Sequence, residues 1–247
     1  MYNGEKVSVI FPTYNEKDSM KESIEDFFSS GIIDEIIVVN NNAVSGTSEE
    51  IAKTKAIELI EKKQGYGHAL ISGMAAAKGD IIILSEPDGT FCGKDVKKLL
   101  AYSEDKDVVF GTRTSSAFIL EGANMGLFLK WGNYAVGKLV EFLFNTTILT
   151  DVGCTMRLLR RRVYEEIKND FRVGGSHFGP HLMLLVITRG IPFVEIPVNY
   201  RKRIGESMVT GSFLKAFRLG IIMIILVLYA RFMSIFCPGS IYYHPKK

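Results

Sequence analysis

The chain has 247 residues, of which 47% are hydrophobic and 23% are charged. This composition excludes a disordered chain, and the length allows one substantial α/β core. The net charge of +3 is uneven: residues 1–200 have 22 basic and 26 acidic groups, a net charge of −4, and residues 201–247 have eight basic and one acidic group, a net charge of +7.

Short β-branched runs alternate with amphipathic stretches in the first half. Strands are predicted at 7–11, 35–39, 56–60, 80–85 and 107–110, and helices at 17–30, 67–78 and 94–102. This alternation is typical of an α/β fold, with a mainly parallel sheet covered by helices on both faces. Ligands bind beyond the carboxyl ends of the strands in such sheets. We therefore expect the polar segments 13–16, 40–47, 86–90 and 112–115 to form one site.

In the second half the pattern changes. Residues 123–145 read as a long apolar helix, 151–157 as a polar turn that enters a short strand, and 191–200 as another strand. No repeat or flexible linker interrupts the chain. The expected organisation is therefore one domain over residues 1–211, followed by an appendage over 212–247.

The appendage contains twelve uncharged residues, 219–230, flanked by Lys215, Arg218 and Arg231. A full membrane span needs about 20 apolar residues. We therefore expect a helix that lies in the membrane interface, with a buried core helix as the alternative. A basic tail beside an apolar run also favours an anionic membrane surface or a phosphorylated partner, and no nucleic acid.

The segment after the buried strand at 80–85 contains two carboxylates, Glu86 and Asp88. A tight turn there can aim both at one cation, and hard oxygen ligands suit Mg²⁺ or Mn²⁺, which also binds substrate phosphates. The alternative is an ordinary turn, since Pro-Asp-Gly is a common turn sequence.

The segment after the first strand offers an aromatic ring and a carboxylate. Tyr14 can stack on a base or ribose, and Glu16 can accept hydrogen bonds from them. The alternative, compatible with the first, is a helix start capped by Thr13 or Asn15.

Six motifs follow one another along residues 7–207: Phe11-Pro12-Thr13-Tyr14-Asn15-Glu16, Val38-Val39-Asn40-Asn41-Asn42 with Gly46-Thr47, Glu86-Pro87-Asp88, Gly111-Thr112-Arg113, Asp151-Val152-Gly153-Cys154-Thr155-Met156-Arg157 and Tyr200-Arg201-Lys202-Arg203-Ile204-Gly205-Glu206-Ser207. This ordered set resembles glycosyltransferase family 2, whose members have the GT-A fold. The last three motifs resemble the branch of dolichol-phosphate mannose synthases and other polyprenyl-phosphate glycosyltransferases.

The resemblance implies a role for each matching position. Glu86 and Asp88 would bind the metal, and Asp88, Arg113 and Arg203 would be catalytic. The implied nucleotide-binding residues are Pro12, Tyr14, Glu16, Val39 and Asn40. Three positions depart from the family: Asn40 replaces a base-reading Asp, Glu86 replaces an Asp, and Met208 follows Ser207 where a Lys is usual. A uridine donor is favoured over a guanosine donor.

A phosphate acceptor is favoured because a phosphate is already ionised and needs no general base. Members that act on hydroxyl groups carry an acidic dipeptide that is absent from residues 176–183. Cations must then hold the acceptor near the donor diphosphate. The residues expected to do so are Lys130, Arg157 and Ser207, beside Arg113 and Arg203. Alternatively, Arg157 pairs with Asp151 and Lys130 is a surface lysine.

The sequence therefore predicts an inverting, metal-dependent transferase that moves a hexose from a UDP- or GDP-hexose to a polyprenyl phosphate. Residues 1–6 contain no apolar run, so no signal peptide is expected. The three cysteines are odd in number and widely spaced, which indicates a reducing compartment without disulfide bonds. Both observations favour a membrane-associated protein whose catalytic domain faces the cytoplasm. One alternative is transfer to a hydroxyl with His181 or Asp151 as the base, and another is a nucleotide-sugar-binding protein without catalysis.

Overall fold

The computed structural model of the chain describes residues 1–120, 123, 126–205 and 212–244. Within these residues seven strands form one sheet, in the order β3-β2-β1-β4-β6-β5-β7. The strands are β1 (Val7–Thr13), β2 (Glu35–Asn40), β3 (Ile57–Ile60), β4 (Ile81–Leu84), β5 (Val108–Thr112), β6 (Arg157–Arg160) and β7 (Phe193–Pro197). The α-helices are α1 (Lys17–Phe28), α2 (Thr47–Ala52), α3 (Tyr66–Ala76), α4 (Val96–Ser103), α5 (Leu127–Phe144), α6 (Arg161–Ile167), α7 (Phe178–Thr188) and α8 (Phe213–Phe236).

The sheet is mainly parallel, as predicted, with one exception. Strand β1 pairs in parallel with β2 and β4, and β5 pairs in parallel with β7. Strand β6 is antiparallel to both β4 and β5, so β4 and β5 point the same way. The carboxyl ends of β1, β2, β4 and β5 therefore meet at one edge. The first residue of β6, Arg157, reaches the same edge opposite Leu84.

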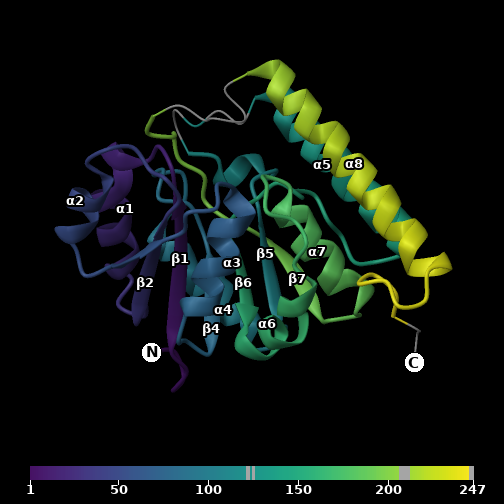
Figure 1. Cartoon of the computed structure of the whole chain (residues 1–247), viewed down its shortest axis with the longest axis horizontal. Helices are drawn as coiled ribbons and strands as arrows, with labels where there is room; N and C mark the ends of the chain where they lie inside the picture. Colours follow the sequence, from purple (N-terminus) through teal and green to yellow (C-terminus); the bar gives the residue numbers. More distant parts are fainter. Residues whose placement is uncertain (121–122, 124–125, 206–211, 245–247) are drawn as a thin grey trace.

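Helices cover both faces of the sheet (Figure 1). In β1, Val9 and Phe11 point toward a cluster that includes Met20 of α1, whereas Ile10 points toward a second cluster that includes Met74 of α3. This alternation follows from the period of two along a strand. All five side chains are fully buried, and each such burial contributes about 1.5–3 kcal/mol.

Three helices were not predicted from the sequence. Helix α2 has six residues and α6 has seven, too short for a clear period. Helix α7 is apolar on all sides because it is buried between the sheet and its neighbours; eight of its eleven residues are buried. A helix of this kind has no amphipathic signature.

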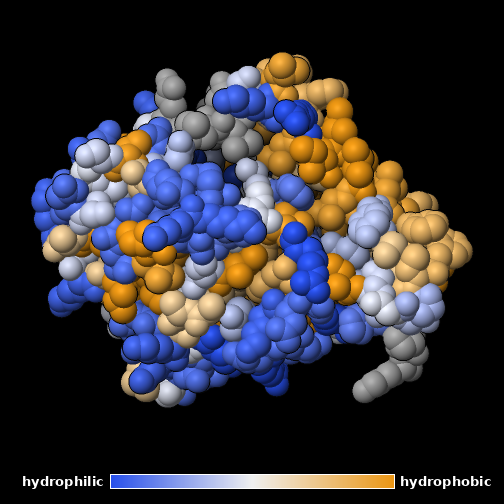
Figure 2. All heavy atoms as spheres, in the orientation of Figure 1, coloured by the Kyte–Doolittle hydropathy of each residue, from blue (hydrophilic) through white to orange (hydrophobic). Residues whose placement is uncertain are grey.

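Helices α5 and α8 pack side by side on one flank of the molecule, and α8 also contacts α7 (Figure 1). Among the described residues, α8 is the one helix long and apolar enough to cross a membrane by length and composition. Its buried stripe is Ala216, Met223, Val227 and Ala230. Figure 2 shows that the side of α8 turned toward the viewer is broadly hydrophobic.

The tail after α8 is anchored in the protein core. Tyr242 is 2% exposed, and its hydroxyl lies 2.6 Å from Nδ1 of His181 in α7. The segment that follows α8 is thus tied to α7 by this buried tyrosine.

Candidate active site

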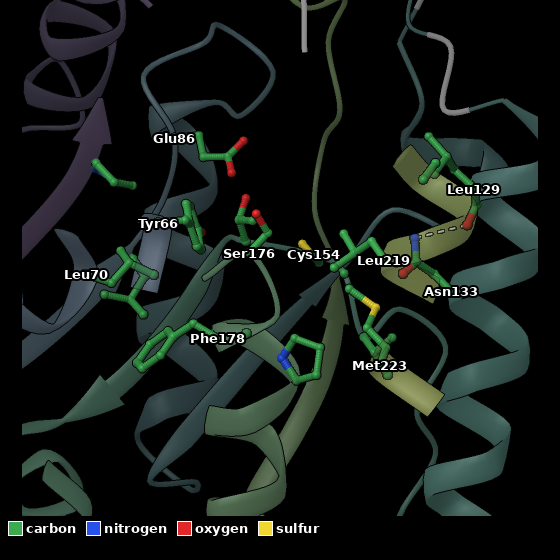
Figure 3. A pocket seen from close by; sticks show the side chains of 18 of the residues that line it. Tyr66, Leu70, Glu86, Leu129, Asn133, Cys154, Ser176, Phe178, Leu219 and Met223 are labelled. Carbon is green, nitrogen blue, oxygen red and sulfur yellow. Dashed lines mark hydrogen bonds between the residues drawn. The ribbon is translucent and has the colours of Figure 1, made fainter. Parts of the chain in front are cut away.

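A cleft of about 920 Å³ extends from the carboxyl edge of the sheet to the space between α5 and α8. Its polar end is lined by Pro12, Tyr14, Glu16, Glu86, Arg113 and Arg203. Its apolar end is lined by Leu129, Val136, Leu219, Met223 and Ile224. Figure 3 shows the two ends in one view, with Glu86 and Tyr66 on one side and Leu129, Leu219 and Met223 on the other.

The carboxylates of Glu86 and Asp88 face the same point. Asp88 is fully buried, and its Oδ1 accepts hydrogen bonds from the backbone N–H and hydroxyl of Thr90, at 2.9 and 2.5 Å. Its Oδ2 lies 2.5 Å from Nη1 of Arg203, and Oε2 of Glu86 lies 3.8 Å from the same nitrogen. Glu86 lines the cleft in which Tyr14 lies, whereas Asp88 lies directly behind it and is not among the lining residues.

This turn has an excess of negative charge. Burial, and then the Asp88 carboxylate, raise the pKa of Glu86 to about 8, although Arg203 opposes the rise. A divalent cation would remove this repulsion, and two carboxylates plus substrate phosphates are a usual ligand set for Mg²⁺. No group of three or more His, Cys, Asp or Glu side chains in the described residues is arranged to hold a metal. The donor set therefore fits a divalent ion whose further ligands come from the substrate.

Arg203 joins three acidic side chains. Its Nη2 lies 3.0 Å from Glu16, while its Nη1 contacts Asp88 and Glu86. Its Nε is buried without a partner among the described atoms, so one donor is left for a substrate oxygen. Its backbone is held beside the acidic turn, because Ile204 N–H donates to the Asp88 carbonyl at 3.0 Å.

Three of the five predicted nucleotide-binding residues, Pro12, Tyr14 and Glu16, line the cleft. Tyr14 is 40% exposed, which leaves its ring free to stack on a ligand. Oε2 of Glu16 accepts hydrogen bonds from the backbone N–H groups of Tyr14 and Asn15, both at 2.9 Å. Glu16 thus fixes the loop that presents Tyr14.

The other two, Val39 and Asn40, are not among the residues that line the cleft. Val39 is fully buried in the core. The Asn40 amide donates to Ser48 and Glu58, at 3.2 and 2.8 Å. Asn41 lines the cleft instead, and its Oδ1 accepts a hydrogen bond from Gly65 N–H at 2.8 Å.

Arg113 is held by Asp151. The sequence analysis gave a pair of Asp151 with Arg157 as an alternative. The guanidinium of Arg113 donates to both carboxylate oxygens of Asp151, at 2.8 and 3.0 Å. Asp151 is fully buried, and Arg113 lines the cleft with its guanidinium carbon 5.4 Å from the centre of the Tyr200 ring.

Arg157 is a buried cation with no carboxylate partner among the described residues. It donates to the carbonyls of Cys154 and Val152, both at 2.8 Å, and to that of Gly179. Arg157 is 2% exposed and lines the cleft. Burial lowers its pKa, which marks a positive charge that a bound anion would stabilise.

The remaining predicted residues are placed as follows. Lys130 lies in the first turn of α5 and is not among the residues that line the cleft, and Ser207 lies outside the described residues. His181 is fully buried against Tyr242, and burial lowers its pKa to about 4. With Asp151 engaged by Arg113, neither of the two candidate bases faces an acceptor.

Sequence reasoning did not assign a role to two cleft residues, Asn41 directly after β2 and Tyr66 at the start of α3. Asn41 directly follows the predicted Asn40. Tyr66 lies between Gly65 and Gly67, and this Gly-Tyr-Gly sequence at a predicted helix start was the available signal.

Comparisons with known proteins show the family and the fold of the chain. A family model described as Glycosyl transferase family 2 matches residues 8–168. The dolichyl-phosphate hexose transferase of Haloferax volcanii is 29% identical over 212 residues, which cover 83% of this chain and 87% of that protein. The low-salt glycan biosynthesis hexosyltransferase Agl6 of the same organism is 25% identical over 246 residues. The match covers 97% of this chain, and the chain spans 55% of the length of Agl6.

Solved structures share the fold. Glucosyl-3-phosphoglycerate synthase from Mycobacterium tuberculosis, in complex with phosphoglyceric acid, superposes with a TM-score of 0.71 at 17% identity and covers 92% of this chain and 80% of its own. The same synthase with Mn²⁺, UDP and glucosyl-3-phosphoglycerate gives a TM-score of 0.69 at 16% identity, with the same coverage. This likeness confirms the predicted GT-A fold.

Proposed function

Since this chain belongs to glycosyl transferase family 2, we propose that it transfers a hexose from a nucleoside diphosphate sugar to a polyprenyl phosphate, with inversion at the anomeric carbon. The observation that carries the proposal is the shape and chemistry of the cleft. It is acidic and polar beside β1 and β4, and it becomes apolar between α5 and α8. An acceptor with a charged head and a hydrocarbon chain matches both ends.

The donor binds at the polar end. Tyr14 stacks on the base, and Pro12 and Glu16 complete the nucleotide pocket. A uridine donor is supported by the structural relative that was crystallised with UDP and Mn²⁺. Val39 and Asn40 act there only through the backbone and the loop they order, because their side chains point elsewhere.

Glu86 and Asp88 are the residues that would hold Mg²⁺ or Mn²⁺. When bound, such an ion stabilises the negative charge of the departing nucleoside diphosphate. Arg203 contacts both carboxylates and has a free Nε, so it reorients toward the diphosphate when its acidic partners are neutralised. Arg113, fixed by two hydrogen bonds to Asp151, adds a positioned positive charge.

The acceptor phosphate binds near Arg157. This buried guanidinium is held in place by carbonyl groups and forms no salt bridge within the described residues, so it can attract an anion in the cleft. The phosphate is already ionised and attacks without a base, in agreement with the engagement of His181 and Asp151 elsewhere. Lys130 and Ser207 remain predicted acceptor contacts.

The membrane supplies the lipid to the apolar end of the cleft. Helix α8 exposes a large hydrophobic face, with Leu214 at 74% and Ile225 at 59% exposed, and α5 adds Phe142 at 83%. So much apolar surface is unfavourable in water and is typical of a membrane contact. We propose that residues 212–247 attach the transferase domain, residues 1–211, to the cytoplasmic face of a membrane.

A comparison of acceptors tests the proposal. The purified protein is incubated with labelled UDP-glucose or GDP-mannose, Mn²⁺, and either a short prenyl phosphate or the corresponding prenyl alcohol. We expect labelled product from the phosphate and none from the alcohol, and loss of transfer in Asp88→Ala. Asp105→Ala, at an exposed aspartate in the turn after α4, is the matched control. Transfer to the alcohol, or to neither acceptor under any donor, would refute the proposal.

A further inference from the structure

The start of α3 is packed unusually closely against the loop that precedes α7. A Cβ added at Gly65 would lie 2.3 Å from the Gly174 carbonyl oxygen, and one at Gly67 would lie 2.4 Å from the Val173 carbonyl oxygen. The backbone N–H of His68 donates to the Gly174 carbonyl at 3.1 Å. Only glycine permits this approach, and the φ of +145° at Gly65 also favours glycine. The residue between the two glycines, Tyr66, is therefore held in a fixed position.

The Tyr66 side chain enters the cleft. It is partly buried and lines the same cavity as Glu86 and Ser176, and the three are drawn on one side of the cavity in Figure 3. Its hydroxyl makes no hydrogen bond within the described part of the chain and is not an enclosed atom, so it is free to bond a ligand in the cavity. A rigidly placed polar group is thus left open to the cavity.

The charged groups around Tyr66 place it between the proposed binding positions of the donor and the acceptor. Burial, and then the Glu86 carboxylate, raise the pKa of Tyr66, whereas the Arg157 guanidinium lowers it. The hydroxyl is thus within electrostatic reach of the acidic turn and of the buried arginine. In the proposed function the donor diphosphate lies at the acidic turn and the acceptor phosphate lies at Arg157. The sugar that is transferred therefore passes between these two positions.

We propose that the Tyr66 hydroxyl hydrogen-bonds to a hydroxyl of the hexose being transferred and so determines which hexose the cleft accepts. The inference rests on the proposed function for the location of the donor. The ligand of this subsite is a neutral sugar, because a tyrosine hydroxyl offers one donor and one acceptor and no charge. Because Tyr66 is held in a fixed position, its hydroxyl can bond only one hydroxyl of the sugar. An epimer with that sugar hydroxyl in the other configuration leaves the tyrosine hydroxyl unpaired and binds more weakly.

Equilibrium binding of UDP, UDP-glucose and UDP-galactose to the full chain tests the proposal, with GDP, GDP-mannose and GDP-glucose as the equivalent set if the protein selects guanosine. Tyr66→Phe removes one oxygen atom that has no partner in the described chain, so the fold is retained, and thermal unfolding checks this. Tyr102→Phe, at a 50% exposed tyrosine of α4, is the matched control.

We expect Tyr66→Phe to bind the bare nucleoside diphosphate as the wild type does, to bind the preferred nucleotide sugar roughly 3- to 10-fold more weakly, and to lose most of the discrimination between the two epimers. An unchanged ratio of nucleotide-sugar to nucleotide affinity, or a loss equal for both, would overturn the inference. These measurements need no acceptor. A protein that fails to glycosylate prenyl phosphate but shows the Tyr66→Phe effect would therefore refute the acceptor and keep the sugar subsite.

Discussion

The buried pair of His181 and Tyr242 predicts that the protein loses stability in mild acid. Nδ1 of His181 lies 2.6 Å from the Tyr242 hydroxyl, and Nε2 faces the Asp170 carbonyl and the Arg172 N–H, each at 3.2 Å. Burial lowers the pKa of His181 from 6.5 to about 4, and nearby His177 adds to the shift. A proton therefore binds the unfolded chain more readily than the folded one.

The magnitude follows from the shift. A fall in the pKa from 6.5 to about 4 corresponds to roughly 3 kcal/mol of unfolding free energy. Because the folded pKa is the lower one, this contribution is fully present above pH 6.5 and is lost as the pH falls through about 4. The loss is a large part of the stability of a typical domain.

Urea unfolding of the detergent-solubilised protein at several pH values between 4 and 7.5 measures this loss. His181→Gln keeps a hydrogen-bonding side chain but does not titrate, so its stability should fall by about 3 kcal/mol less than that of the wild type over this range. His68→Gln, at a histidine of α3 outside this pair, is the control. Identical pH dependence in the wild type and His181→Gln would refute the account of how the tail is anchored.

Three further predictions concern the cleft and the membrane face. Arg157→Lys keeps the charge but loses part of the carbonyl-bound fork, and we expect its KM for prenyl phosphate to rise about 10-fold while UDP affinity, measured by calorimetry, is unchanged. A Cβ added at Gly220 meets no atom within 4 Å, and Gly220 lines the cleft. Gly220→Leu should therefore make α8 about 1 kcal/mol more stable but fill part of the cleft, so that transfer to a long prenyl phosphate falls at least about 10-fold in a chain-length series; equal rates for all chain lengths would contradict the groove. Ile225→Asp with Leu228→Asp should abolish sedimentation with anionic vesicles and leave donor binding intact, and continued sedimentation would exclude α8 as the membrane contact.

Much of the sheet was predictable because its strands are continuous apolar runs. The observed β1, β2 and β4 begin within one residue of the predicted strands. They are buried on both faces, and a continuous apolar run of this length is typical of a central strand. The direction of β6 was not predictable. Its residues 157–160 read as a short apolar strand in either orientation, and pairing with β4 and β5 is decided by contacts between segments far apart in the chain.

The candidate site was predictable where a local motif carries the function. Glu86 and Asp88 converge because two residues on one tight turn share a direction. The partner of Asp151 was not predictable, because proximity in sequence offered Arg157 as an alternative partner, whereas the fold brings Arg113, 38 residues away, to both of its oxygens. Tyr66 was missed because the close packing of Gly65 on Gly174 brings two distant segments together and leaves only a pair of glycines in the sequence.

The most direct test of the account is the binding of Mn²⁺ to the acidic turn in the presence of nucleotide. Electron paramagnetic resonance counts the free ion as the protein is titrated, with and without UDP. We expect tight binding only when UDP supplies the remaining oxygen ligands, and at least about 10-fold weaker binding in Glu86→Gln and in Asp88→Asn, with Asp105→Asn unchanged. Binding that is the same without UDP, or that survives both substitutions, would contradict the assignment of the metal to this turn.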